Sequence, residues 1–253
     1  MNEQLKTILS QIRKLALEEG IENISIQTIC NRLSICHEDL SKLIRNENDL
    51  IAKVLEFERE SFMAIFDEYN FEGMNAIDIL MIVSKEIAIR YYDVTPAISR
   101  SLKQLYPDIY QDHFQKRVDF IFGKIQINLK KGIDQGMYRP DLSIELVARL
   151  YLSRLIDIHN EDIFPPNQFN FQTLFKVLFD NFVRSVATQN GLYYFETKMK
   201  KIDWNQWLSK HFRQLLLNTL SCWKRRLGKN YKNVLPKMKN QSGYLYRSQK
   251  ILE

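Results

Sequence analysis

Cysteine and histidine side chains near the N-terminus could hold a metal ion such as zinc. Cys30, Cys36 and His37 lie within eight residues of one another, and zinc prefers thiolate and imidazole ligands. A structural zinc site needs four such ligands, and no fourth one lies nearby in the sequence. Cys30 falls on the apolar side of a predicted helix, where a cysteine acts as a small buried hydrophobe. The sequence therefore predicts no metal site and no cofactor.

Motifs for catalysis or nucleotide binding are also missing from the sequence. The eight glycines are scattered and form neither a P-loop nor a dinucleotide-binding fingerprint. The motif H-E-x-x-H does not occur, and no Glu precedes a His by three residues, as di-iron helix bundles require. His113 and His159 stand alone in helical segments. We therefore expect a protein that is not an enzyme.

A different set of side chains, all near the N-terminus, could bind phosphates and the edges of bases. Lysine and arginine neutralise phosphates, and hydroxyl, amide and imidazole groups hydrogen-bond to phosphates and bases. Asp39, in the same region, could accept a hydrogen bond from the N4 amino group of cytosine. The candidates for DNA contact are Ser25, Gln27, Arg32, His37, Ser41, Lys42 and Arg45.

The elements that would position these side chains are short helices. Apolar residues have helical spacing from Leu5 to Ala16, and Gly20 ends that helix. Ser25 is placed to cap a second helix, and Ser34 and Ile35 form a tight break before a third. A helix-turn-helix needs two short helices that cross over a small apolar core, so that the second can enter the major groove. The predicted core is Leu5, Ile8, Leu9, Ile12, Ile26, Ile29, Leu33, Ile35, Leu40, Leu43 and Ile44.

The rest of the chain also has helical spacing. Asn46 and Asp49 can cap a long helix that continues to about Tyr69, and Pro96 and Pro107 suit the first turns of helices. Ser143 is predicted to cap another helix. No run reaches the roughly 18–20 apolar residues that a membrane helix needs, and the N-terminus lacks the apolar region of a signal peptide. The predicted fold is all-α, with an N-terminal three-helix helix-turn-helix headpiece followed by a C-terminal helical bundle. Its further helices are expected over residues 75–93, 107–136, 143–160 and 170–188.

The headpiece resembles the TetR (tetracycline-repressor-like) family of transcriptional regulators. Residues 20–29 read G-I-E-N-I-S-I-Q-T-I, which is similar to the G-Y-x-x-T-S-I-x-x-I of that family. Residues 46–50, N-E-N-D-L, resemble its S-K-E-E-L entry into a fourth helix. The resemblance implies a homodimer that binds a palindromic operator and is controlled by a small-molecule effector, most often as a repressor.

The headpiece departs from the family pattern in its turn and in its charge. The family usually has Gly where this chain has Ser34, and uncharged residues where it has Glu38 and Asp39. Residues 1–55 contain 7 basic and 8 acidic residues, so few cations can meet phosphates. The alternative interpretation is an effector-binding or protein-interaction module whose headpiece no longer binds DNA.

Aromatic and aliphatic residues of the bundle suggest two further sites. An aromatic-rich effector pocket would contain Phe62, Phe66, Tyr91, Tyr92, Phe114 and Phe120, although the same spacing also occurs in an ordinary core. The resemblance implies a dimer interface on the last two helices of the bundle. Its candidates are Leu146, Leu150, Leu174, Leu178 and Phe182, which would also fit the inner helices of a monomer.

The net charge of +6 comes from the C-terminal tail. Residues 197–253 contain 14 Lys and Arg against only Asp203 and Glu253, whereas residues 1–196 contain 22 basic and 28 acidic residues. Residues 204–226 have the pattern of a basic amphipathic helix with tryptophans on one face, and the chain after Gly228 is polar. This helix could dock on the bundle, contact a nucleic-acid backbone, lie on a membrane or bind another protein.

These patterns together predict three segments. Residues 1–46 would form the DNA-binding headpiece, residues 47–196 an effector-binding and dimerisation domain, and residues 197–253 the basic tail. The expected partners are double-stranded operator DNA, a second copy of the chain and an unidentified small molecule, and a membrane is not an expected partner. Three cysteines are too few for a secreted disulfide framework, so we expect a cytoplasmic protein.

Overall fold

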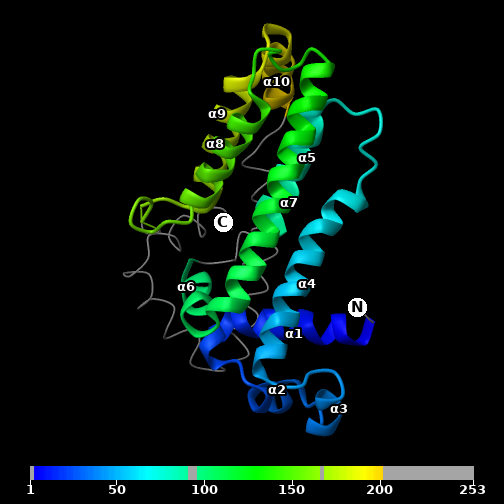
Figure 1. Cartoon of the computed structure of the whole chain (residues 1–253), viewed down its shortest axis with the longest axis vertical. Helices are drawn as coiled ribbons and strands as arrows, with labels where there is room; N and C mark the ends of the chain where they lie inside the picture. The colour runs from blue at the N-terminus through cyan, green and yellow to red at the C-terminus, as the bar shows by residue number, and fades with distance from the viewer. Residues whose placement is uncertain (1–2, 91–95, 166–167, 202–253) are drawn as a thin grey trace, which may run out of the picture. The chain divides into compact units, whose positions relative to one another are not determined.

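A computed structural model describes residues 3–90, 96–165 and 168–201. Every regular element within these residues is a helix (Figure 1), and the one strand-like feature among them is an isolated antiparallel bridge between Tyr138 and Ala187. The predicted all-α fold is confirmed. None of the described helices combines the length and the apolar character needed to cross a lipid bilayer.

The headpiece contains the predicted short helices. They are α1 (Glu3–Glu19), a single turn η1 (Ile21–Asn23), α2 (Ile26–Leu33) and α3 (His37–Ser41). Ser25 caps α2, because its side-chain oxygen accepts the backbone N–H of Thr28 at 3.1 Å. The helical spacing and the cap were both readable from the sequence.

Seven helices follow the headpiece within the described residues. They are α4 (Glu47–Glu68), α5 (Ala76–Arg90), α6 (Pro96–Leu105), α7 (Pro107–Asp134), α8 (Ile144–Asp157), α9 (Phe171–Val186) and α10 (Gln189–Lys201). Pro96 and Pro107 begin α6 and α7, as their fixed φ favours. The sequence pattern did not predict α10, which runs across residue 196, where we expected the bundle to end.

Side-chain caps fix where two of the longer helices begin. Asn46 caps α4, because its side-chain oxygen accepts the N–H of Asp49 at 2.9 Å. The Asp49 carboxylate reaches back beyond the cap and accepts the N–H of Arg45 at 2.9 Å. Asn170 caps α9 in the same way, through the N–H of Thr173 at 2.8 Å. Ser143 stands at the cap position of α8, but its side chain makes no capping hydrogen bond to the described chain.

The apolar core of the headpiece continues into the bundle. Leu9, Ile12, Ile29 and Leu40 are fully buried, whereas Ile26, Leu33, Ile35 and Leu43 of the predicted core are half-buried. Leu50, Ile51, Val54 and Leu55 of α4 and Leu102 of α6 belong to the same cluster. A shift of α4 or α6 must therefore disturb the packing of the headpiece.

The long helix α7 lies at the centre of the bundle, where it contacts α4, α5, α6 and α8 (Figure 1). The turn that follows it is closed by Tyr138, which is fully buried. Its hydroxyl lies 3.2 Å from the Asn128 side-chain oxygen, and the Asn128 amide donates to the carbonyl of Ala76 at 2.8 Å. Gly132 leaves the space that the Tyr138 ring fills, since a Cβ at Gly132 would lie 2.0 Å from that ring.

The chain divides into two compact units, residues 1–198 and residues 199–253. Of the second unit, only residues 199–201 at the end of α10 are among the described residues. The predicted amphipathic helix over residues 204–226 lies outside them.

Candidate DNA-binding headpiece and ligand cavities

The turn between α2 and α3 has the geometry that lets two short helices cross. Ser34 adopts a left-handed conformation, with φ 55° and ψ 39°, and the N–H of Ile35 donates to the carbonyl of Cys30 at 3.1 Å. Glycine normally occupies this conformation because it lacks a Cβ. Ser34 stands where the family pattern has glycine, and the backbone makes the turn despite the substitution.

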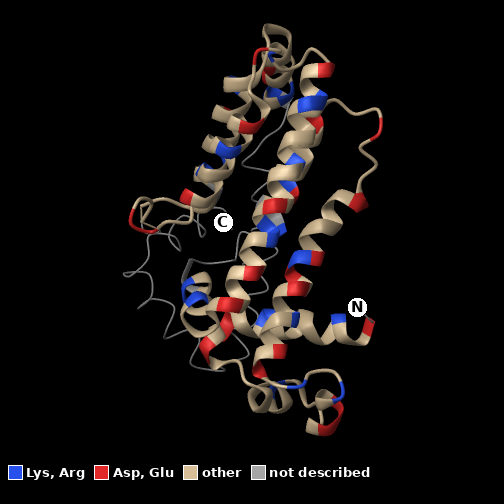
Figure 2. Cartoon of the chain, in the orientation of Figure 1, with Lys and Arg blue, Asp and Glu red and all other residues tan. Residues whose placement is uncertain are grey.

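Helix α3 is short and has an acidic first turn. Leu40 anchors it in the core, while Glu38 and Asp39 are exposed. The acidic residues of α3 are coloured red in Figure 2. Carboxylates at this end interact favourably with the helix dipole. Cys36 stands at the cap position without a capping hydrogen bond within the described residues, so the dipole is compensated by the two acids alone.

The structure brings the predicted DNA-contacting residues to α2, α3 and the start of α4. Ser25 is half-buried and occupied as a helix cap. The others are exposed: Gln27, Arg32, His37, Ser41, Lys42 and Arg45. Most of the set is therefore available to a partner.

Two of the basic candidates form ion pairs with carboxylates of the headpiece. Arg32 lies 2.8 Å from a carboxylate oxygen of Glu19 in α1, and the Lys42 amine lies 2.7 Å from Asp39. The hydrogen bond that Lys42 donates to Asp39 raises the pKa of Lys42, which therefore stays charged. Exposed ion pairs of this kind are weak, so a phosphate can compete for the cation.

A cavity of about 360 Å³ lies among α4–α9. Phe62 and Phe114, two of the predicted pocket residues, line it, together with Ile121, Leu152 and Phe175. Phe66 lines a smaller neighbouring cavity of about 70 Å³. This interior is mostly apolar with a few polar groups, which is the usual make-up of a small-molecule site.

The other predicted pocket residues lie elsewhere. Phe120 does not line the large cavity; it packs edge-on against Phe62 and Phe66, with ring centroids 6.1 and 5.3 Å away. It is therefore part of the packing behind the cavity wall. Tyr91 and Tyr92 lie outside the described residues.

The polar groups of the large cavity were missed by the sequence analysis, which followed the aromatic residues. They are Ser99, Tyr110, Arg117, His159 and Asn160. Arg117 also lies over the face of Phe62, 5.4 Å from the ring centroid. Tyr110, Phe114, Arg117 and Ile121 are spaced three or four residues apart, and this spacing on one helix was the available signal.

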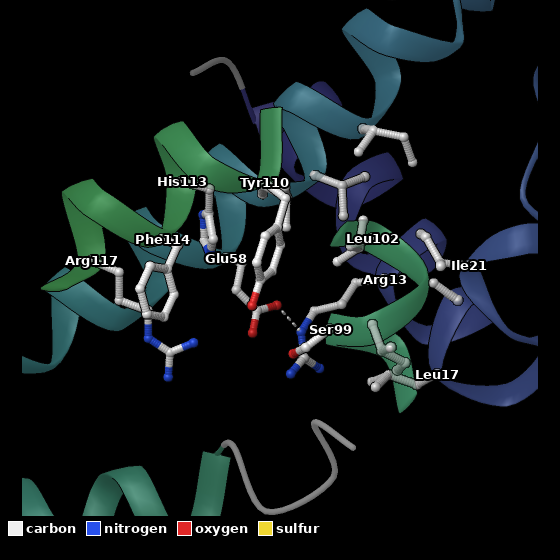
Figure 3. A pocket seen from close by; sticks show the side chains of 15 residues that line it. Arg13, Leu17, Ile21, Glu58, Ser99, Leu102, Tyr110, His113, Phe114 and Arg117 are labelled. Carbon is white, nitrogen blue, oxygen red and sulfur yellow. Dashed lines mark hydrogen bonds and ion pairs between the residues drawn. The ribbon is translucent and has the colours of Figure 1, made fainter. Parts of the chain in front are cut away.

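A second cavity, of about 90 Å³, lies where the headpiece meets the bundle (Figure 3). We call it the junction cavity; its polar lining is Arg13 of α1, Glu58 of α4, Ser99 of α6, and Tyr110, His113 and Arg117 of α7. Arg13 donates from Nε to Glu58 at 2.7 Å, and both side chains are largely buried. This ion pair ties α1 to α4.

His113 is the buried polar residue of the junction cavity. Its exposed fraction is 6%, and its Nδ1 atom has no hydrogen-bond partner among the described residues. Its other nitrogen, Nε2, is left to make the hydrogen bond to the Leu55 backbone. Burial lowers the pKa of His113 to about 4, and the positive charge of Arg117 adds to this effect.

The predicted dimer residues divide into an exposed and a buried group. Leu146 and Leu150 of α8 are 61% and 65% exposed, and Leu174 and Leu178 of α9 are half-buried. Phe182 instead points into its own chain, where it is buried and stacks on Tyr151 at 3.9 Å. Phe182 is therefore a core residue, and the exposed Val177 takes a place on α9 that the sequence analysis did not assign.

The described residues contain no group of three or more His, Cys, Asp and Glu side chains that could hold a metal ion. Cys36 is exposed and Cys30 is half-buried on α2.

Comparisons with known proteins find this fold among transcriptional regulators. No protein-family model matches the chain, and no curated protein matches it. Among solved structures, a TetR transcription regulator from Haloarcula marismortui is similar with a TM-score of 0.61 and 17% identity, covering 74% of this chain and 100% of its own. A protein from Saccharomonospora viridis, in complex with choline, has a TM-score of 0.58 and 16% identity, covering 75% and 100%.

The reduced form of NemR from E. coli has a TM-score of 0.58 and 10% identity, covering 74% of this chain and 98% of its own. These likenesses extend over the headpiece and the bundle together, well beyond the 45 or so residues that carry the sequence resemblance. The chain therefore has the fold of the TetR-family transcriptional regulators, as the resemblance of its headpiece implied.

Proposed function

We propose that this chain is a DNA-binding transcriptional regulator, acting as a homodimeric repressor under the control of a small molecule. The observation that carries the proposal is the helix-turn-helix unit itself. Helices α2 and α3 cross at the left-handed Ser34, Leu40 anchors α3, and the polar residues around α3 are exposed. This is the arrangement by which a second helix enters the major groove.

Individual residues of the headpiece would take different roles on DNA. Lys42 and Arg45 would contact phosphates, which position the headpiece and supply most of the salt-dependent affinity. Asp39, in the first turn of α3, would accept from the N4 amino group of a cytosine. Binding would release Lys42 from Asp39, so that one ion pair is exchanged for a phosphate contact and a base contact.

The homodimer would form through the exposed apolar face of α8 and α9. Leu146, Leu150 and Val177 are more than half exposed there, and apolar side chains of this size favour burial against a partner. A two-fold axis through this face would set two headpieces against two half-sites of a palindromic operator.

The cavity of about 360 Å³ would hold the effector. The structure from Saccharomonospora viridis, which has the same fold, is in complex with choline, and this supports a small molecule as the kind of ligand. The effector can control DNA binding only if it binds two conformations of the dimer, which differ in the spacing of the headpieces, with different affinities. The core shared by α4, α6 and the headpiece offers a physical route for that coupling.

A mobility-shift experiment tests the proposal with DNA from upstream of the chain's own coding region. Arg45→Ala and Lys42→Ala are expected to weaken specific binding about tenfold or more in the dimer, because each removes two phosphate contacts. The matched control is Lys116→Ala, since Lys116 is an exposed lysine of α7 that pairs with Asp112 at 2.7 Å much as Lys42 pairs with Asp39. The control should bind as the wild type does.

The pairing of Arg32 and Lys42 with carboxylates favours a second candidate function. In that alternative, the chain binds a small molecule or a protein through its bundle, and its headpiece no longer binds DNA. Absence of DNA binding at low salt, with effector binding retained, would support this alternative.

A further inference from the structure

The junction cavity and the large cavity share part of their lining. Ser99, Tyr110, Phe114 and Arg117 border both of them. The two cavities therefore adjoin at these four side chains, and Arg13, Glu58 and His113 border the junction cavity but not the large one (Figure 3). Both cavities are mostly apolar, and the junction cavity adds Arg13, Glu58 and the buried His113 to the Arg117 that borders both.

His113 determines which group can occupy the junction cavity. Nε2 donates its proton to the Leu55 backbone, so Nδ1 carries a lone pair and acts as an acceptor. A buried acceptor without a partner is costly, and a hydrogen-bond donor placed against it removes that cost. The pKa of His113, near 4, keeps the imidazole neutral at physiological pH.

The charges around His113 also limit which head group of a ligand can lie beside it. Arg117 and Arg59 both act on the imidazole as positive charges, and Glu58 acts as a negative one. A cationic head group would be repelled by these two arginines, which outnumber the one glutamate. A carboxylate would carry no hydrogen for Nδ1 and would place a lone pair against a lone pair. An uncharged hydroxyl satisfies Nδ1 without adding a charge.

We propose that the chain binds an amphipathic alcohol or phenol, with its apolar body in the large cavity and its hydroxyl donating to Nδ1 of His113 in the junction cavity. This inference rests on the proposed effector site and names the class of ligand that the site takes. The hydroxyl would lie beside the Arg13–Glu58 pair that joins α1 of the headpiece to α4. The ligand would thus act directly on the contact between headpiece and bundle.

Three probes with one body and different head groups test the proposal: phenylbutanol, phenylbutanoate and phenylbutylamine. Their binding to the full chain is measured by isothermal titration calorimetry without DNA. Phenylbutanol is expected to bind at least tenfold more tightly than either charged probe. Equal affinities, tighter binding of a charged probe, or no binding of any probe would overturn the proposal.

Two substitutions of His113 then locate the hydroxyl. His113→Phe keeps the bulk of the side chain and removes the acceptor, so phenylbutanol affinity should fall about tenfold, the loss of one buried hydrogen bond. His113→Gln retains an acceptor and should recover part of that affinity. The loss should be larger for His113→Phe than for His159→Phe, because His159 lines the large cavity but not the junction cavity.

The reverse order of these losses would place the hydroxyl away from His113 and overturn the proposal. Circular dichroism of each variant checks that it is folded. Because no DNA is present, a headpiece that fails to bind DNA does not affect this result. If none of the probes binds, the DNA-binding proposal is unaffected, because the mobility-shift experiment tests it separately.

Discussion

Single buried residues decide how the protein responds to pH, and His113 is the clearest case. In the folded chain its pKa is about 4, against 6.5 in an exposed histidine, because burial and Arg117 disfavour the imidazolium form. Between these two values the unfolded chain binds more protons than the folded one. The free energy of unfolding therefore falls as the pH is lowered from 6.5 towards 4.

We predict that this group alone costs the protein roughly 2 kcal/mol of unfolding free energy between about pH 7.5 and pH 5. Urea unfolding at both pH values measures it, in the wild type and in His113→Phe. The variant should lose less stability than the wild type on acidification, since it has no imidazole to protonate. An equal loss in both proteins would show that His113 titrates normally.

Interactions between residues close together in the chain could be predicted from the sequence. Ser25 and Asn46 cap helices through backbone groups three residues away, and such contacts follow from spacing alone. Phe114 and Phe120 could not be told apart in this way. Both lie on α7, and only the positions of the neighbouring helices put one at the cavity and the other behind its wall.

At the scale of elements, the turn after α7 depends on two close approaches of the chain. The ring of Tyr138 packs against Gly132 inside α7, and the N–H of Arg139 donates to the carbonyl of Val186 at the end of α9. These contacts join α7 to α9 through a segment that the sequence shows only as a turn. Arg139 and Val186 are 47 residues apart in the chain, so spacing could not predict their contact.

Two glycines of the same helix provide a matched prediction. Gly132→Ala should lower the free energy of unfolding by about 2 kcal/mol or more, because the new Cβ would overlap the Tyr138 ring. Gly123→Ala in α7 should leave it unchanged or raise it by up to about 1 kcal/mol, because nothing outside the local backbone of α7 lies within 4 Å of the Cβ position. Thermal and urea unfolding of both variants measures the difference. Equal effects would mean that Tyr138 is not packed against Gly132.

At the scale of the whole molecule, the proposed regulator needs two copies of the chain. The charge of the described headpiece gives little help to DNA binding, so affinity would depend on two headpieces acting together. Sequence patterns found the apolar residues of α8 and α9 but could not show which of them face outwards. Leu150 and Phe182 both belong to rows of apolar residues with helical spacing, yet Leu150 is 65% exposed and Phe182 is buried.

We predict that Leu146→Glu combined with Leu150→Glu converts the dimer into a monomer, because four carboxylates would have to be buried in one interface. Sedimentation equilibrium measures the mass. The control is Ile127→Glu, which introduces one carboxylate per chain at a residue of α7 that is 64% exposed. The control should remain dimeric, and a wild type that is itself monomeric would refute the proposed interface.

A salt titration of DNA binding by the full chain, with DNA from upstream of its coding region, tests whether the headpiece binds DNA. We predict specific binding, with an association constant whose logarithm falls linearly with the logarithm of the salt concentration. Lys42→Ala should reduce that slope by about two per dimer, one phosphate contact for each headpiece, while Lys116→Ala leaves it unchanged. No binding even at low salt, or a slope that Lys42→Ala does not alter, would contradict the claim that this headpiece holds DNA.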